Sequence, residues 1–500
     1  MTFIEKPLSL LYFRKRLEKL ENFKKNPFEV QNSIFHNLIK HSVGTEWGIK
    51  YKYKNLSSIN DFREEVPIQS YETLEPYFIR MLEGEQNILW PTKINWFSKS
   101  SGTTTGTSKY IPVSKETLFD CHYEAGKALM GTYINNCEDT RLLTGKNISV
   151  IGSFSDQFGK DVLVGDVSAI LSKNLPPWAD NVKLPPKEIA YIPNWNEKII
   201  KIAHNVVDKN VTSLLGVPSW MSVILRKTCE LSGKTVMEMW PNLEVFFHGG
   251  VSFEPYKKMY SDLIDNPNMH YINVYNASEG FFAFQDTLDK SDMLLLLDYN
   301  MFFEFVPIGS QDSHYAIGLD EVELGKNYAL VISNDSGLWR YQIGDTIQFT
   351  SLYPFRIKVT GRTKSFINVV GEEVIVNNSD TAISVACSKT NSFVEEYTVA
   401  PKFLPDGKVV HEWYIEFKDE PEDKEAFIDF LDEALQEENS DYKVKRFNNL
   451  ILQRPLVKFL PNNTFYKWFE SKNKLGGQNK VVRLSEKRTI LDELDTLLNN

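Results

Sequence analysis

The chain is 500 residues long, and 42% of its residues are hydrophobic, 13% aromatic and 24% charged. Domains usually hold about 100–200 residues, so we expect two or more of them, and the composition excludes disordered, collagen-like and coiled-coil chains. Lysine and arginine total 56 against 66 aspartates and glutamates, which gives a net charge of −10. This acidic balance argues against binding mainly to nucleic-acid backbone or to anionic lipid.

The cysteines and apolar segments indicate a reducing compartment. Cys121, Cys137, Cys229 and Cys387 lie far apart and form no Cys-x-x-Cys pair, which argues against disulfides and structural zinc. No apolar run approaches the roughly 18 residues that a membrane span needs. The N-terminus lacks the order of charges and apolar residues found in a signal peptide. We therefore expect a cytoplasmic protein with no membrane partner.

The first two thirds of the chain show an α/β pattern. Residues 9–42 predict two helices, broken near Asn26-Pro27, because Leu10, Phe13, Leu17 and Leu20 recur at helical spacing. From about residue 90 to 280, short apolar runs typical of buried strands alternate with helical patterns. The predicted strands are Ile94–Ser98, Ile148–Ile151, Val211–Leu215, Leu243–Phe247 and Tyr271–Tyr275.

Between residues 293 and 360 the pattern changes to short strands separated by Gly, Asp and Asn turns, which predicts an antiparallel sheet or small barrel. These strands are Met301–Val306, Tyr328–Ser333, Leu338–Ile343, Thr346–Phe349 and Phe355–Thr360. A small α+β unit follows, with a strand at Val409–Phe417 and a helix at Glu422–Glu437. We therefore predict a large N-terminal α/β domain, residues 1–361, and a small C-terminal α+β domain, residues 362–500.

The sharpest local motif is a run rich in Ser, Thr and Gly that follows a predicted strand and precedes a helical pattern. It consists of Ser100, Ser101, Gly102, Thr103, Thr104, Thr105, Gly106, Thr107, Ser108 and Lys109. Its glycines allow close approach of a ligand, and its hydroxyls, main-chain N–H groups and lysine suit a polyphosphate. The spacing is not that of a Walker A loop. The alternative is a flexible linker, although linkers are rarely placed directly between a buried strand and a helix.

Three weaker motifs gain weight from their order along the chain. Tyr275–Gly280 ends a predicted strand with one carboxylate, and taken alone it is a polar turn. Trp339–Asp345 places an Asp in a turn between two predicted strands, where such residues usually bond their own backbone. Gly476–Arg483 is a glycine loop followed by cations, and taken alone it is a solvated loop.

Together these motifs resemble the adenylate-forming superfamily, which includes acyl-CoA synthetases, nonribosomal adenylation domains and luciferases. More closely, the chain resembles the auxin-responsive acyl acid–amido synthetase family, specifically its bacterial branch. The stretches that carry the resemblance are Thr45–Gly48, Val66–Leu74, Ser100–Lys109, Tyr275–Gly280, Tyr341–Asp345 and Gly477–Arg483. They span nearly the whole chain, and the resemblance implies the adenylate-forming fold.

The resemblance also implies roles for particular residues. The Ser100–Lys109 loop would hold the β- and γ-phosphates of ATP, with Lys109 as a catalytic cation. The nucleotide and acyl pocket would include Tyr275, Asn276, Ala277 and Ser278, and Glu279 would help to hold Mg²⁺. Asp345 and Arg362 would contact the ribose. Gly249 and Gly250, after His248, would pack on the adenine. Lys480 corresponds to the superfamily's mobile catalytic lysine, carried into the site by rotation of the C-terminal domain about a hinge near Gly361-Arg362.

The activity implied by this resemblance has two steps. ATP first converts a small carboxylic acid into an acyl-adenylate, and an amino-acid amine then takes the acyl group to give an N-acyl amide. An acyl-CoA ligase that shares the first step is one alternative, and a nucleotide-binding protein without turnover is another. The mobile lysine argues against the second alternative, because a protein that only binds nucleotide has no need of it.

Overall fold

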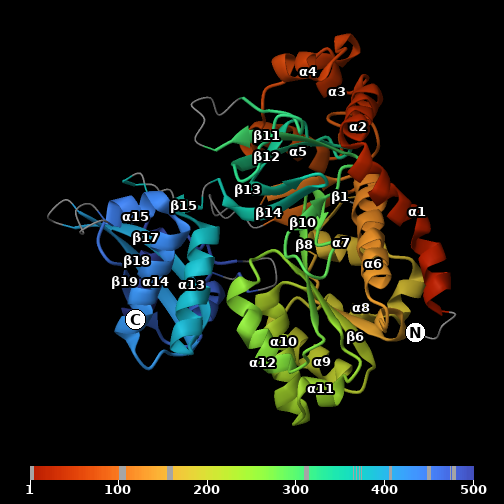
Figure 1. Cartoon of the computed structure of the whole chain (residues 1–500). Coiled ribbons are helices and arrows are strands. Elements are labelled where there is room, and N and C mark those ends of the chain that lie inside the picture. Colours follow the sequence, from red (N-terminus) through yellow and green to blue (C-terminus); the bar gives the residue numbers. More distant parts are fainter. Residues whose placement is uncertain are drawn as a thin grey trace. The chain divides into compact units, whose positions relative to one another are not determined.

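The structure is a computed structural model (Figure 1). It describes residues 5–100, 109–154, 162–308, 315–363, 365–367, 369–370, 372, 374–404, 408–446, 452–472, 474–475 and 480–499. The chain divides into two compact units, Met1–Gly250 with Ile264–Val359, and Val251–Leu263 with Thr360–Asn500. The predicted division after residue 361, as a boundary between moving domains, stays a prediction.

The N-terminal region is helical, as predicted. Helices α1 (Glu5–Lys25) and α2 (Pro27–Ser42) are separated by Asn26 alone. Pro27 is the first residue of α2, where its missing N–H costs nothing. Helix α1 packs against α6 (Glu124–Asn136) (Figure 1). Four short helices follow α2, namely α3 (Glu46–Lys50), η1 (Tyr53–Asn55), α4 (Ile59–Glu65) and α5 (Tyr71–Leu82).

One half of the main sheet is parallel and confirms the predicted α/β pattern. Its strands run in the order β5-β3-β6-β7-β8, with bounds β3 (Lys146–Ser149), β5 (Lys183–Leu184), β6 (Val211–Gly216), β7 (Val245–Gly249) and β8 (His270–Ala277). The helices of this region are η2 (Thr117–Tyr123), η3 (Leu142–Thr144), α7 (Val167–Lys173), η4 (Pro177–Asn181), α8 (Lys187–Ala190), α9 (Trp195–Val206), α10 (Pro218–Ser232), α11 (Val236–Met239), η5 (Glu254–Tyr256) and α12 (Lys257–Ile264).

The other half of the same sheet is antiparallel, as the change of pattern after residue 293 predicts. Its strands run in the order β11-β12-β13-β14-β10-β9 and join the parallel half at β8. Their bounds are β9 (Gly280–Phe284), β10 (Met293–Leu295), β11 (Met301–Pro307), β12 (Asn327–Asn334), β13 (Tyr341–Leu352) and β14 (Phe355–Arg362). Strand β8 is therefore where the sheet changes from parallel to antiparallel pairing.

A second, three-stranded sheet leads into the Ser/Thr/Gly loop. Strand β1 (Trp96–Ser100) pairs antiparallel with β2 (Lys109–Val113) and parallel with β4 (Leu163–Gly165). Ser100 and Lys109 face each other across the first pair. The loop therefore joins two strands, and the expectation that a helix follows it directly is wrong. The helical pattern that suggested this begins only after β2, at η2.

The second unit is an α+β fold built on the sheet β17-β18-β19. The predicted strand at 409–417 and helix at 422–437 are present as β18 and α14. The strands are β15 (Phe366–Ile367), β16 (Val374–Ile375), β17 (Phe393–Phe403), β18 (Val409–Asp419) and β19 (Leu456–Leu460). The helices are α13 (Val376–Thr390), α14 (Lys424–Glu438), α15 (Ser440–Arg446), α16 (Thr464–Ser471) and α17 (Thr489–Asn499).

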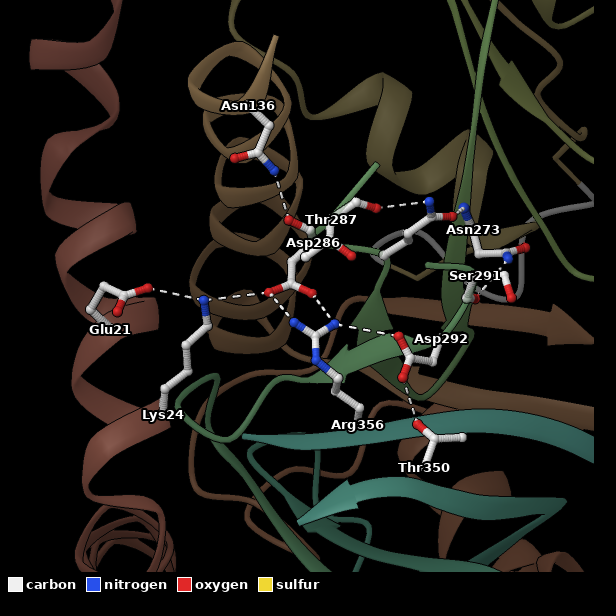
Figure 2. Close-up of polar contacts among 11 residues, drawn as sticks. Glu21, Lys24, Asn136, Asn273, Asp286, Thr287, Ser291, Asp292, Thr350 and Arg356 are labelled. Carbon is white, nitrogen blue, oxygen red and sulfur yellow. Dashed lines mark hydrogen bonds and ion pairs between the residues drawn. The ribbon is translucent and has the colours of Figure 1, made fainter. Parts of the chain in front are cut away.

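A buried charged network holds the strand that leads out of the first unit. Arg356 of β14 lies between Asp286 and Asp292, at 3.1 Å from Asp286 Oδ2 through Nη2 (Figure 2). Lys24 of α1 approaches Asp286 at 3.4 Å (Figure 2). Arg356 and Asp286 are both buried, so the loss of either side chain would leave an uncompensated charge in the protein interior. The network fixes β14 to α1 and to the segment after β9.

Two further expectations concern cysteines and membranes. The four cysteines are thiols rather than disulfides, as predicted. Among the residues with described coordinates, no helix combines the length and apolar character needed to cross a bilayer.

Candidate active site

The candidate site lies where the parallel strands β7 and β8 end. The carboxyl ends of parallel strands meet at one edge, and ligands of open α/β sheets bind outside that edge. Gly249 ends β7 and faces Val274 of β8. A Cβ at Gly249 would lie 2.2 Å from the carbonyl oxygen of Val274, so no larger residue fits without moving the backbone. Gly250 follows with φ of +85°.

The second and third sequence motifs contact each other directly. The hydroxyl of Tyr275, on β8, donates a hydrogen bond of 2.8 Å to Oδ2 of Asp345, on β13. Three strands lie between β8 and β13 in the sheet order. At about 4.8 Å per strand, a flat sheet would separate them by roughly 19 Å, so the sheet must curve for this bond to form. Curvature therefore joins two motifs that lie 70 residues apart.

Asp345 lies in a β-bulge within β13. The residues paired with Ala329 and Val331 of β12 are Thr346 and Gln342, four residues apart, so β13 carries two extra residues here. The expectation that Asp345 sits in a turn between two strands is wrong, because Tyr341–Leu352 is one continuous strand. Gly344 has φ of +93°, which a side chain would disfavour. Bulges re-aim side chains, and this one directs Asp345 to Tyr275.

Ser278 is held from the strand that carries the Ser/Thr/Gly loop. Ser98 Oγ on β1 lies 2.7 Å from Ser278 Oγ, and both serines are buried. This bond ties β1, the strand that leads into the loop, to the turn after β8. Ser98 is not predicted from the sequence, because its only local signal is its position two residues before the loop.

At the other end of the loop, Lys109 contacts Tyr71, a member of the Val66–Leu74 stretch. Lys109 Nζ lies 5.0 Å from the centre of the Tyr71 ring, a cation–π distance. The Tyr71 hydroxyl accepts a 3.0 Å hydrogen bond from the backbone N–H of Tyr110. Burial raises the pKa of Tyr71 to about 12, so the phenol stays neutral at physiological pH. Tyr71 thus fixes both the backbone and the cation at this end of the loop.

Glu279 is buried next to Ser278 in the turn between β8 and β9. Asn334, at the end of β12, donates a 2.9 Å hydrogen bond to the Glu279 carbonyl oxygen. This asparagine is not predicted from the sequence either. No group of three or more potential metal-binding side chains occurs in the described part of the chain. One carboxylate is nevertheless compatible with Mg²⁺, which proteins often hold with one or two carboxylates plus substrate phosphates.

A buried polar cluster lies beside Asn334. Thr117 of η2 donates to Asp335 Oδ1, and the Ser114 backbone N–H donates to Ser336 Oγ at 2.9 Å. Burial raises the pKa of Asp335 to about 7. The cluster joins the β12–β13 connection to η2, a π-helical segment. Neither the cluster nor the π-helix is predicted from the sequence. π-Helical turns are found frequently at functional sites.

The remaining predicted residues fall into three groups. Ser101, Gly102, Thr103, Thr104, Thr105, Gly106, Thr107 and Ser108 lie outside the described residues, as do Gly476 and Gly477. Arg362, at the end of β14, and Lys480 belong to the second compact unit. Asn276 and Ala277 complete β8 between Tyr275 and Ser278. Of the predicted positions, the structure thus joins Tyr275 to Asp345 and places Gly249, Ser278 and Glu279 at the ends of β7 and β8.

Known proteins resemble this chain over nearly its full length. It is 21% identical to an indole-3-acetic acid-amido synthetase of Arabidopsis thaliana, covering 96% of this chain and 93% of the relative. It is 24% identical to a jasmonoyl–L-amino acid synthetase of Nicotiana attenuata, with 79% and 77% covered.

Two solved structures share the fold. An acyl acid amido synthetase in complex with 2,4-DB superposes with a TM-score of 0.79 at 16% identity, over 96% of this chain and 95% of that one. A 2-hydroxyisobutyryl-CoA ligase in complex with 2-HIB-AMP gives 0.57 at 12% identity, over 97% and 92%. The predicted adenylate-forming fold is therefore confirmed.

Three family descriptions match successive parts of the sequence. The GH3 family N-terminal domain matches residues 16–269, the central domain 294–362 and the C-terminal domain 377–489. The first match alone covers more than half of the chain, and the three matches follow one another along the sequence. The chain belongs to the GH3 family, the acyl acid amido synthetases that its motifs resemble.

Proposed function

We propose that this protein is an AMP-forming ligase that activates a carboxylic acid with ATP and transfers the acyl group to the amine of an amino acid. The contact between Tyr275 and Asp345 carries the proposal, because it unites two motifs at the end of the parallel strands in a GH3 chain. The named relatives are amido synthetases. A carboxylic acid and an amino acid are therefore the substrates to test.

Adenylation solves a chemical problem, since a carboxylate would have to expel oxide to be substituted. In the first step a carboxylate oxygen attacks the α-phosphorus of ATP, and the bond to pyrophosphate breaks. In the second step the amine attacks the carbonyl carbon of the acyl-adenylate, and AMP leaves with the original carboxylate oxygen. The amine loses one proton as the amide forms. Charge builds on the phosphates in the first step, so fixed donors and cations should lower its barrier.

Each site residue has a distinct part in this scheme. Asp345 would accept hydrogen bonds from the ribose hydroxyls while Tyr275 holds its second oxygen, so that the carboxylate is positioned before ATP binds. Gly249 and Gly250 would let the adenine approach the end of β7, and Arg362 would contact the ribose. The Ser100–Lys109 loop would bind the β- and γ-phosphates. Lys480 would bring positive charge to the reacting phosphates from the second unit.

Glu279 is the residue that would hold Mg²⁺. Asn334 bonds to the Glu279 carbonyl, and the preceding residue, Ser278, bonds to Ser98. The turn that carries the Glu279 carboxylate is therefore restrained. Bound Mg²⁺ would supply Lewis-acid stabilisation of phosphate charge. The protein's own contribution is to hold one buried carboxylate at the end of β8, directly after the Ser278 that bonds to Ser98 of β1.

An acyl-CoA ligase activity is the second candidate, since a CoA ligase shares the fold. A panel of aromatic, aliphatic and benzoate-like acids, tested for ATP–pyrophosphate exchange with and without amino acids or coenzyme A, separates the two. We expect exchange with some acids, and net AMP release stimulated by amino acids. Stimulation by coenzyme A alone would favour the second candidate, and no exchange from well-folded protein would contradict adenylation.

A further inference from the structure

Arg483 is a buried cation three residues after Lys480. Its side chain is 7% exposed, and its guanidinium donates to Asp380 of α13, whose side chain is 2% exposed. Arg483 Nε also lies 3.5 Å from Glu396 Oε1 on β17, and the guanidinium carbon lies 4.9 Å from the centre of the Tyr397 ring. Contacts with helix α13, strand β17 and the Tyr397 ring therefore fix the Arg483 side chain.

The backbone around Arg483 is fixed as well. The Val399 N–H donates to the Arg483 carbonyl at 2.7 Å, and the Ser485 N–H donates to the Val399 carbonyl at 3.1 Å. Thr398 Oγ1 donates to the Val482 carbonyl at 2.7 Å. Residues 482–485 thus extend along β17, and Val481 is buried in a neighbouring apolar cluster. The fixed segment begins one residue after Lys480, which is itself half-buried.

The Tyr397 hydroxyl also donates to Asp380, so Arg483, Asp380 and Tyr397 form a triad. The same unit contains a second Arg–Asp–Tyr triad. Arg446 of α15 pairs with Asp432 of α14 through Nε at 2.7 Å, and the Tyr442 hydroxyl donates to the same carboxylate at 2.8 Å. The side chains of Arg446 and Asp432 are 8% and 9% exposed. This triad holds α15 to α14 and lies 34 residues before Lys480 in the sequence. It offers a matched internal control.

We propose that the Arg483–Asp380 pair positions Lys480 for the adenylation step. This inference rests on the proposed function, because it assigns the pair a part in the first half-reaction. Three residues span at most about 11 Å, so an anchor at Arg483 restricts where the Lys480 backbone can lie. Arg483 does not reach the substrates itself and is a positioning residue.

The chemistry of the Arg483–Asp380 pair suits a contact that sets the orientation of the chain. A buried ion pair is weak evidence for stability, because well-packed apolar residues often serve equally well. Apolar contacts are non-directional, whereas a planar guanidinium with donors in fixed directions sets orientation. An apolar residue at position 483 could fill the space without setting the angle at which the chain leaves β17. A misplacement of about 1 Å can cost about 100-fold in rate.

The test compares Arg483→Met with Arg446→Met in the full-length protein. Each variant removes a buried arginine that pairs with an aspartate and lies beside a tyrosine, so both should lower the melting temperature. Arg483→Met should lower the maximal rate of acid-dependent ATP–pyrophosphate exchange by about 100-fold, and should spare amide formation from supplied acyl-adenylate. Arg446→Met should leave the exchange rate per folded molecule unchanged.

A double-mutant cycle with Lys480→Ala tests the coupling directly. In the Lys480→Ala background, Arg483→Met should cause no further loss of exchange, because the group that it positions is absent. Equal losses in both backgrounds would overturn the proposal, and so would equal losses of exchange in both arginine variants. If Arg483→Met does not fold, Asp380→Asn tests the same coupling. Absence of exchange in the unmodified protein would instead contradict the proposed function.

Discussion

The two regions that hold the predicted functional residues are built differently. In the first unit, side chains from distant strands bond to each other, as in Ser98 to Ser278 and Tyr275 to Asp345, over 180 and 70 residues of sequence. In the second unit, Lys480 precedes a short segment that is fixed by backbone pairing to β17 and by one buried arginine.

This difference matches the tasks that we propose for the two regions. A nucleotide site benefits from polar groups whose partners are satisfied before the ligand arrives, because little reorganisation is then needed. A lysine that acts in only one of two steps needs firm contacts within its own unit and no permanent contacts with the other unit. Changes in the first region should therefore affect binding, and changes near Lys480 should affect one half-reaction.

The largest effect is expected for Lys480→Ala. Loss of one preorganised electrostatic group typically costs about 100- to 1,000-fold in rate, and we expect such a loss in ATP–pyrophosphate exchange. Amide formation from supplied acyl-adenylate should remain within a few-fold of the unmodified protein. Equal losses in both half-reactions would remove the distinction between the two regions.

Asp345→Ala should weaken ATP binding without unfolding the protein. Hydrogen bonds to a charged acceptor contribute roughly 1.5–3 kcal/mol, about one to two decades in affinity. Tyr275→Phe removes only the hydroxyl that holds the carboxylate and should cost less than tenfold, near 1 kcal/mol. Calorimetric titration with ATP and a thermal melt separate the outcomes. Unchanged ATP affinity with a collapsed melting temperature would show that the bulge is purely structural.

Glu279→Gln should raise the Mg²⁺ concentration needed for half-maximal exchange by about tenfold, the equivalent of 1.4 kcal/mol. Glutamine keeps the size of the side chain and removes its charge, so the turn that Asn334 holds should persist. Titrations of exchange against Mg²⁺ for both proteins give the comparison. An unaltered Mg²⁺ dependence would exclude Glu279 from the metal site.

The smallest effect concerns Asp335 and pH. A carboxyl whose pKa is about 7 when folded and about 4 when unfolded favours the folded state when protonated. Its contribution is therefore full below about pH 4 and is lost as the pH rises through 7. Asparagine does not titrate, so the melting temperature of Asp335→Asn, relative to the unmodified protein, should rise between pH 5 and 8.

Asp61→Asn is the matched control for this pH effect. Hydrogen bonds from Ser57 lower the pKa of Asp61 to about 2. Its contribution is present above about pH 4 and is lost only as the pH falls through 2. The difference between Asp61→Asn and the unmodified protein should therefore be constant from pH 5 to 8. A flat profile for Asp335→Asn as well would show that Asp335 is ionised in the folded protein.

Local signals in the sequence predicted much of the fold. The helix break at Asn26-Pro27, the alternation of strands and helices and the antiparallel series after residue 293 all follow from residue type and spacing. The bulge at Gly344-Asp345 is not predicted, because Gly-Asp is compatible with both a bulge and a turn, and only the pairing with β12 distinguishes them. Ser98 and Asn334 were missed because their bonds depend on how distant strands are placed.

The central claim is that a carboxylate oxygen attacks the α-phosphorus of ATP. The most direct test supplies an active acid labelled with ¹⁸O in its carboxylate, together with an amino acid, and analyses the nucleotide product by mass spectrometry. The account predicts one ¹⁸O atom in the phosphate of AMP for each amide formed, with unlabelled pyrophosphate. Label in inorganic phosphate together with ADP, or amide formation with unlabelled AMP, would contradict it.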